Sequence, residues 1–241
     1  MYKYILIVGL LLLHAIAGAD SLHFQSGPQQ TQMIELYTSQ GCSSCPPAEK
    51  FLNQYTNDAL LWKHYIPMAL HVDYWDFLGW KDRYALAANT KRQYSYAQLK
   101  KVSTVYTPGF VVNGKEWRGW RYQGIKRLET KQVGNLSVTV SAENLDVKFE
   151  PSVRIKDTLV LHYALLGMGL KTEIMAGENR GRHSQHDFVV LTRQRLLGSK
   201  NHWQAVMPAR TLQAKKYALV VWLSRINDPS PIQAAGAYLD M

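Results

Sequence analysis

The stretch that decides the fold reads Glu35-Leu36-Tyr37-Thr38-Ser39-Gln40-Gly41-Cys42-Ser43-Ser44-Cys45-Pro46-Pro47-Ala48-Glu49. An apolar, strand-favouring run leads into a turn of small residues, and a pair of cysteines follows. Cys42 and Cys45 are the only cysteines of the chain. A scaffold of several disulfides and an all-cysteine zinc site are therefore both excluded.

Two interpretations of the cysteine pair give it no redox role. As a structural staple, its four-residue ring contributes only about 1.9 kcal/mol in the chain-entropy model, against roughly 3 kcal/mol for a fifteen-residue loop. As a metal half-site, a thiolate pair suits Cu(I) or zinc. None of the eight histidines lies at a ligand-like spacing from the pair, so a distant one such as His71 would have to complete the site.

The third interpretation is a redox dithiol at a helix N-terminus, and we favour it. Pro46 and Pro47 suit the first helical turn, where a missing N–H costs nothing. Ala48, Phe51 and Leu52 then recur at helical spacing. Unpaired backbone N–H groups and the helix dipole lower the pKa of a cysteine at this position and make it a nucleophile.

Residues 1–19 predict a secretory signal peptide, with Lys3 as the basic region, an apolar core over Ile5–Ala17 and a small-residue cleavage site at Ala17-Gly18-Ala19. The alternative is an uncleaved anchor. The core is too short to span a bilayer, and no later segment is long and apolar enough to do so. We therefore expect a secreted or periplasmic protein in an oxidising compartment.

The composition and the charge distribution limit the classes of partner that we expect. The formal net charge is +10, but the basic residues are scattered and no nucleic-acid motif appears. The charge predicts a solvated basic surface. We expect a protein or a small thiol or disulfide as substrate, an unknown redox partner, no nucleic acid and no cofactor.

The following segments alternate between strand and helix, and Asn113-Gly114 predicts a hairpin turn. The expected elements, in order, are a strand at 33–37, a helix at 44–55, a strand at 66–72, a helix at 81–101, strands at 105–112 and 116–120, and a helix at 124–132. This order places the cysteines beyond the carboxyl end of the first strand, where active sites of open α/β sheets lie.

The pattern changes after Gly134. Short alternating runs separated by turn residues predict an all-β, sandwich-like domain, with residues 159–166 and 217–223 apolar enough to be central strands. We expect a signal peptide at 1–19, a polar lead-in at 20–32, an α/β domain at 33–134 and a β-sandwich-like domain at 135–241.

The element order resembles the thioredoxin fold. In that fold a cis-proline dipeptide stands beside the redox cysteines and before a hairpin, and Thr107-Pro108 occupies the matching place. The resemblance implies that Pro108 is cis and that the backbone of Thr107 pairs with a substrate strand. The fold class that we expect is an α/β thioredoxin-like domain followed by an all-β sandwich-like C-terminal domain.

Longer motifs narrow the resemblance. They are Thr38–Ala48, His71-Val-Asp-Tyr-Trp-Asp-Phe-Leu-Gly-Trp-Lys-Asp82, Val105–Gly114 and Gly177-Glu-Asn-Arg-Gly-Arg182. Over roughly residues 33–190 the chain resembles a family of secreted bacterial proteins of unassigned function with a thioredoxin-like fold. The family implies a fold and a redox dithiol, but no substrate.

Further candidates surround the dithiol. Glu35 could accept a proton from Cys45 as buried acids before such motifs do, although it could equally be an exposed strand residue. Asp73 and His71 share one face of their expected strand and could also act on protons there, or they could be a satisfied polar pair at the strand end. Trp75 and Trp80 belong to an aromatic insertion that either lines a substrate groove or packs as a second core.

The loop after residue 176 offers two more features. His183-x-x-His186-Asp187 is either a metal triplet or an exposed polar loop, and Glu178-Asn179-Arg180 could form an interdomain contact.

The sequence thus predicts a thiol-disulfide oxidoreductase. Cys42 attacks a disulfide, Cys45 resolves the intermediate, and Thr107-Pro108 holds the substrate. The Ser-Ser dipeptide between the cysteines does not reveal the direction of electron flow. The alternatives are a non-catalytic thioredoxin-like binding protein, and a copper- or zinc-handling protein that uses the cysteine pair.

Overall fold

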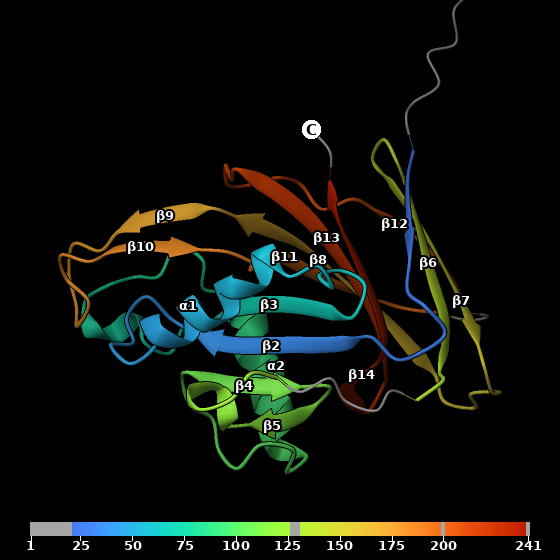
Figure 1. Cartoon of the computed structure of the whole chain (residues 1–241), viewed down its shortest axis with the longest axis horizontal. Helices are drawn as coiled ribbons and strands as arrows, with labels where there is room; N and C mark the ends of the chain where they lie inside the picture. The colour runs from blue at the N-terminus through green and yellow to red at the C-terminus, as the bar shows by residue number, and fades with distance from the viewer. Residues whose placement is uncertain (1–20, 126–130, 199–200, 240–241) are drawn as a thin grey trace, which may run out of the picture.

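The computed structural model describes residues 21–125, 131–198 and 201–239. Its centre is an eight-stranded mixed sheet (Figure 1). The strands in spatial order are β14 (Asp228–Leu239), β13 (Lys216–Arg225), β8 (Leu159–Met168), β11 (Val189–Leu197), β3 (Tyr65–His71), β2 (Gln32–Thr38), β4 (Gly109–Val112) and β5 (Lys115–Trp117). The predicted signal peptide, and residues 126–130 of the predicted helix 124–132, lie outside the described residues.

The elements around the cysteines follow the predicted order. β2 runs parallel to β3 and antiparallel to β4, and Asn113 and Gly114 form the β4–β5 turn with positive φ angles of 46° and 80°. Helix α1 (Pro46–Asn53) follows the cysteines, and α2 (Ala87–Gln98) precedes β4. Three short 3-10 helices, η1 (Gln54–Asn57), η2 (Asp76–Leu78) and η3 (Gly119–Arg121), complete this region.

The predicted fold class is wrong. β3 pairs in parallel with β11 at Ala69 and Val189, and the backbone N–H of Ala69 donates to the carbonyl oxygen of Phe188 at 2.8 Å. Strands from after residue 135 therefore extend the sheet that contains β2 and β3. The described chain is mostly β-strand with two α-helices, rather than a thioredoxin-like α/β domain followed by an all-β one. Alternation in a sequence indicates which side of a strand is buried, but it does not say which strand lies next to it.

A second sheet packs against the C-terminal half of the large one. Its strands, in spatial order, are β1 (Leu22–Gln25), β6 (Gly134–Ser141), β7 (Asn144–Pro151) and β12 (His202–Val206), at the right of Figure 1. β8 lies between two cores: Leu161 and Leu165 pack towards β6 and β7, whereas Ala164 and Leu166 join the core around β2 and β3. Burial on both faces explains the apolar sequences of β8 and β13, and their prediction as central strands is confirmed.

A hairpin links the C-terminal half to the cysteine region. β9 (Leu170–Glu173) and β10 (His183–His186) form a two-stranded sheet that extends over α1, at the upper left of Figure 1. The side-chain amide of Asn53 on α1 donates to the carbonyl oxygen of Gln185 at 3.2 Å. The loop between β9 and β10 carries Gly177–Arg182 and reaches the cysteines. None of the described helices combines the length and the apolarity that crossing a bilayer requires.

Candidate functional site

Cys42 and Cys45 form a disulfide in the loop between β2 and α1. Both residues have 0% exposed surface. The hydroxyl of Ser44 lies 3.4 Å from the Cys42 sulfur, and Cys45 is the N-cap residue of α1. The disulfide therefore occupies the predicted helix terminus but is covered.

The backbone donors expected at this terminus are largely absent. Pro46 and Pro47 have no N–H, and the N–H groups of Ala48 and Glu49 both donate to the Cys45 carbonyl oxygen, at 2.9 and 3.1 Å. The expectation that unpaired N–H groups of the first turn would stabilise a thiolate is wrong. A thiolate at this position would be stabilised by the helix dipole and by the Ser44 hydroxyl instead.

The β9–β10 loop covers the disulfide. The side-chain amide of Asn179, which is 1% exposed, donates to the carbonyl oxygens of Gln40 at 2.8 Å and Cys42 at 2.9 Å. The Glu178 carboxylate accepts from the Ser43 backbone N–H at 3.3 Å. Glu178 and Asn179, for which the sequence suggested an interdomain contact, thus contact the loop that carries the cysteines.

A groove of about 360 Å³ adjoins the cysteine loop. It is lined by Ser44, Thr104, Tyr106, Thr107, Pro108, Arg118, Trp120 and Arg121. The Thr107–Pro108 peptide bond is cis, as the resemblance implies. The indole N–H of Trp75 donates to the Thr107 hydroxyl at 2.8 Å, and Trp75 also packs against Gly41. Three of the four predicted substrate-binding residues, Thr107, Pro108 and Trp75, therefore meet beside the disulfide.

Trp80 lies elsewhere. Its indole N–H donates to the Gln40 side-chain oxygen at 3.0 Å, and its Cβ lies against Gly177. Trp80 is therefore packed beneath the β9–β10 loop, where it supports the cover of the disulfide rather than the groove.

Glu35 and Asp73 are engaged with other partners. The buried Glu35 carboxylate binds the Arg92 guanidinium through two hydrogen bonds, at 2.7 and 2.9 Å, and accepts from Tyr37 and Tyr96. Because residues alternate between faces along a strand, Glu35 points towards α2, whereas Thr38 points towards α1. Asp73 accepts from the Thr90 hydroxyl at 2.6 Å.

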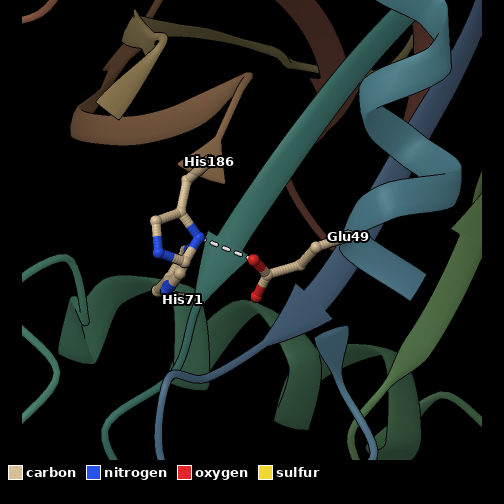
Figure 2. Close-up of side chains that lie close together, drawn as sticks. All are labelled: Glu49, His71 and His186. Atoms are coloured by element: carbon tan, nitrogen blue, oxygen red, sulfur yellow. Dashed lines mark hydrogen bonds and ion pairs between the residues drawn. The ribbon is translucent and has the colours of Figure 1, made fainter. Parts of the chain in front are cut away.

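A different set of titratable side chains lies on the α1 face. Glu49 of α1, His71 at the end of β3 and His186 of β10 converge with ligand atoms within 4.8 Å of one another (Figure 2). All three residues are buried. Glu49 is not among the site residues predicted from the sequence, although its position four residues after Cys45 places both side chains on one helix face.

The hydrogen bonds fix the proton positions in this cluster. The Gln40 side-chain oxygen must face the Trp80 N–H, because an indole only donates. The Gln40 NH₂ group then faces Nε2 of His186 at 3.2 Å, so this nitrogen accepts. Nδ1 of His186 consequently carries a hydrogen and donates to the Glu49 carboxylate at 2.6 Å.

The neighbouring charges shift the pKa values in this cluster. Burial opposes ionisation of Glu49, but its interactions with His186 prevail and hold the pKa of Glu49 below its ordinary value. Burial likewise opposes charge on His71, but the carboxylate of Asp82, 2.7 Å from Nδ1, raises the pKa of His71. Within the described part of the chain, Nε2 of His71 has no hydrogen-bond partner.

The hydrogen bonds of this cluster are better suited to proton transfer than to coordination of a metal ion. Nε2 of His71 and the Glu49 carboxylate could each ligate a cation. His186 could do so through Nδ1 only with Nε2 protonated, and that N–H would then face the NH₂ group of Gln40. Metal-bound histidines require an acceptor at this position. His183, three residues before His186 on the strand, is exposed, so the two histidines do not form the considered metal triplet.

The chain resembles proteins whose function is not assigned. Residues 33–224 match the family described as "Protein of unknown function (DUF1223)". The chain belongs to this family. The predicted membership in a family of unassigned function is confirmed, whereas secretion stays a prediction. No protein with a curated description matches the chain.

Two solved structures are similar to it. A crystal structure of an Agrobacterium tumefaciens protein has 22% sequence identity and a TM-score of 0.60, over 87% of this chain and 94% of that one. HBP35 of Porphyromonas gingivalis has 12% identity and a TM-score of 0.57, over 88% of this chain and 76% of that one. At such identities the likeness concerns the fold alone.

Proposed function

We propose that this family member is a secreted or periplasmic thiol-disulfide oxidoreductase that acts through Cys42 and Cys45. The observation that carries the proposal is the shared groove: Ser44, between the two cysteines, lines it together with Thr107 and Pro108. A substrate strand in this groove would run alongside the disulfide. The aromatic and basic side chains of Trp120 and Arg121 supply contacts for it.

The exchange balances as follows for a substrate dithiol. A substrate thiolate bonds to the Cys42 sulfur, the Cys42–Cys45 bond breaks, and its electron pair leaves on Cys45. The second substrate thiolate then attacks the substrate sulfur of the mixed disulfide and releases Cys42. The protein gains two electrons, and the substrate becomes a disulfide. Reduced protein runs the same steps backwards, and the redox poise decides the direction.

Glu49 is the proton partner that the geometry favours for Cys45. Both side chains project from one face of α1, one turn apart. The Glu49 carboxylate is hydrogen-bonded to His186 and to the Thr38 hydroxyl at 2.6 Å. Glu35, in contrast, projects from the opposite face of β2, where the Arg92 guanidinium neutralises it.

Access to the sulfur atoms requires movement. Asn179 holds the β9–β10 loop on the cysteine loop, and Trp75 packs against Gly41. In this conformation the disulfide is closed to an incoming thiolate, because neither cysteine has exposed surface. We infer that substrate binding in the groove displaces this cover.

The test is the alkylation rate of reduced protein as a function of pH, with Cys42→Ser and Cys45→Ser alongside. We expect Cys42 alone to react rapidly, with an apparent pKa well below the free-thiol value of about 8.5. Two ordinary or unreactive thiols would overturn the proposal and leave a binding protein with a structural disulfide. Stoichiometric copper or zinc that is lost in the serine variants would overturn it in favour of metal handling.

A further inference from the structure

A second cavity, of about 280 Å³, lies between α2, β8, β11 and the β13–β14 turn and shares no lining residue with the groove beside the disulfide. Four arginines line it: Arg92, Arg193, Arg195 and Arg225. Asp228 is the one carboxylate among the lining residues. The cavity therefore concentrates positive charge.

Three of these five charges already have partners. Arg92 is paired with Glu35 inside the core. At the rim, Arg225 pairs with Asp157 at 2.7 Å and Asp228 with Lys101 at 3.0 Å. The lining carboxylate is therefore not available to balance the two remaining arginines.

Arg193 is the exception inside the cavity. One of its terminal nitrogens donates to the carbonyl oxygen of Ala88, but its buried Nε has no hydrogen-bond partner among the residues that the structure describes. Among the described residues, no carboxylate forms an ion pair with Arg193 or Arg195. Burial, together with the charge of Arg92, lowers the pKa of Arg193 to about 10. A buried cation without a counter-charge is costly.

His162 forms part of the same wall. It is 6% exposed and stacks on Trp222, with ring centroids 5.0 Å apart. The Ser224 hydroxyl donates to the carbonyl oxygen of Arg225 and so accepts from Nε2 of His162 at 2.9 Å, which leaves Nδ1 as an acceptor that has no partner among the described residues. Burial and the arginine charges hold the pKa of His162 well below its ordinary value. The wall of the cavity thus includes two buried nitrogens, Nε of Arg193 and Nδ1 of His162, that have no hydrogen-bond partner among the described residues.

We propose that this cavity binds a small, monoprotonated tetrahedral oxyanion of the phosphate class, either free or as a phosphomonoester, with a charged oxygen on Arg193 and its P–OH group donating to Nδ1 of His162. A guanidinium presents its N–H groups in a fork that matches phosphate oxygens. The anion would supply the counter-charge that the described residues do not give to Arg193. A nucleic-acid backbone is a poorer match for a cavity of about 280 Å³, since such interfaces are broad surfaces.

The experiment is thermal unfolding of the full chain with inorganic phosphate, against sodium chloride at equal ionic strength. At a phosphate concentration of about five times the Kd, we expect the midpoint temperature of unfolding to rise by roughly 2–4 °C. Glycerol phosphate as a second ligand distinguishes a phosphomonoester site from one for free phosphate. Acetate should give no rise.

Arg193→Gln should lose the phosphate shift, whereas Arg154→Gln, at an exposed arginine outside the cavity, should keep it. If Arg193→Gln does not fold, Arg195→Gln should weaken the shift. A shift that equals that of chloride, or that survives in both cavity variants, would overturn the proposal. The Cys42→Ser/Cys45→Ser protein should still bind phosphate, so this site and the redox proposal can fail separately.

Discussion

The side-chain nitrogen of Asn179 lies 2.9 Å from the carbonyl oxygen of Cys42, although 137 residues separate them in the sequence. The same amide group reaches Gln40. Asn179 therefore ties the β9–β10 loop to the loop that carries the disulfide. A residue from the distant part of the chain therefore holds the cover of the disulfide in place.

Asn179→Ala removes both hydrogen bonds. Each is worth about 1 kcal/mol, so the covering loop should open more often and dithiothreitol should reduce the disulfide about thirtyfold faster. Arg180→Ala is the matched control, because Arg180 is exposed in the same loop. Equal rates for Asn179→Ala and the parent protein would mean that the loop does not limit access.

Glu49→Gln tests the proton partner. A general acid or base typically raises the rate of the catalysed step 10²–10⁴-fold. Disulfide exchange by Glu49→Gln near neutral pH should therefore be about 100-fold slower. Its pH profile should shift, because the charge of the Glu49 carboxylate, which stays ionised in this range owing to its lowered pKa, no longer acts on the Cys45 thiol. Glu49→Asp should recover part of the rate. An unaltered pH profile for Glu49→Gln would assign the residue to packing alone.

Glu35→Gln tests the alternative acid. It leaves Arg92 buried without its counter-charge, which costs about 3–5 kcal/mol of the free energy of unfolding. Urea denaturation measures this loss. Replacing both partners, as Glu35→Met with Arg92→Met, should recover most of it. A folded Glu35→Gln protein with slowed exchange and unchanged stability would return Glu35 to the catalytic site.

His162 predicts a pH-dependent stability. Because its pKa is depressed in the folded state, the unfolded chain takes up a proton first as the pH falls. The stability that neutral His162 contributes is complete above the unfolded value of about 6.5 and is lost below it. The arginines that face the ring, Arg92, Arg193 and Arg195, cause part of this depression and stay charged throughout.

The measurement compares unfolding free energies at pH 7.5 and pH 5. Below about pH 6.5, the free energy of unfolding of the parent protein should fall by up to about 1.4 kcal/mol per pH unit more than that of His162→Phe. The phenylalanine keeps an aromatic ring stacked on Trp222. His183→Phe, at an exposed histidine, should behave as the parent does. Parallel pH curves for parent and His162→Phe would contradict the prediction.

The local elements near the cysteines could be predicted because their signals are local. Pro46 and Pro47 mark a helix start, and Asn113-Gly114 marks a hairpin. The pairing of β3 with β11 has no such signal, since nothing near Ala69 identifies Val189 as its partner. The expected fold class was wrong for that reason.

The site was predicted in part. Cys42, Cys45 and Pro108 come from short motifs, and the structure places them in one region. His186 belongs to a stretch that reads equally well as a polar loop, yet it is 2% exposed and binds Glu49. Only the three-dimensional course of β10 brings it to α1. Alternation along β2 explains why Glu35 faces away from the cysteines.

The parallel junction between β3 and β11 also sets limits on how the protein can be divided. A fragment that ends at residue 134 retains both cysteines and the groove but exposes one edge of β3, a template for aggregation. It also lacks the asparagine that covers the disulfide and the histidine that binds Glu49. A chimera that joins the N-terminal part to another protein would therefore carry the disulfide without the loop that covers it. Protein engineering should for this reason transfer the whole chain.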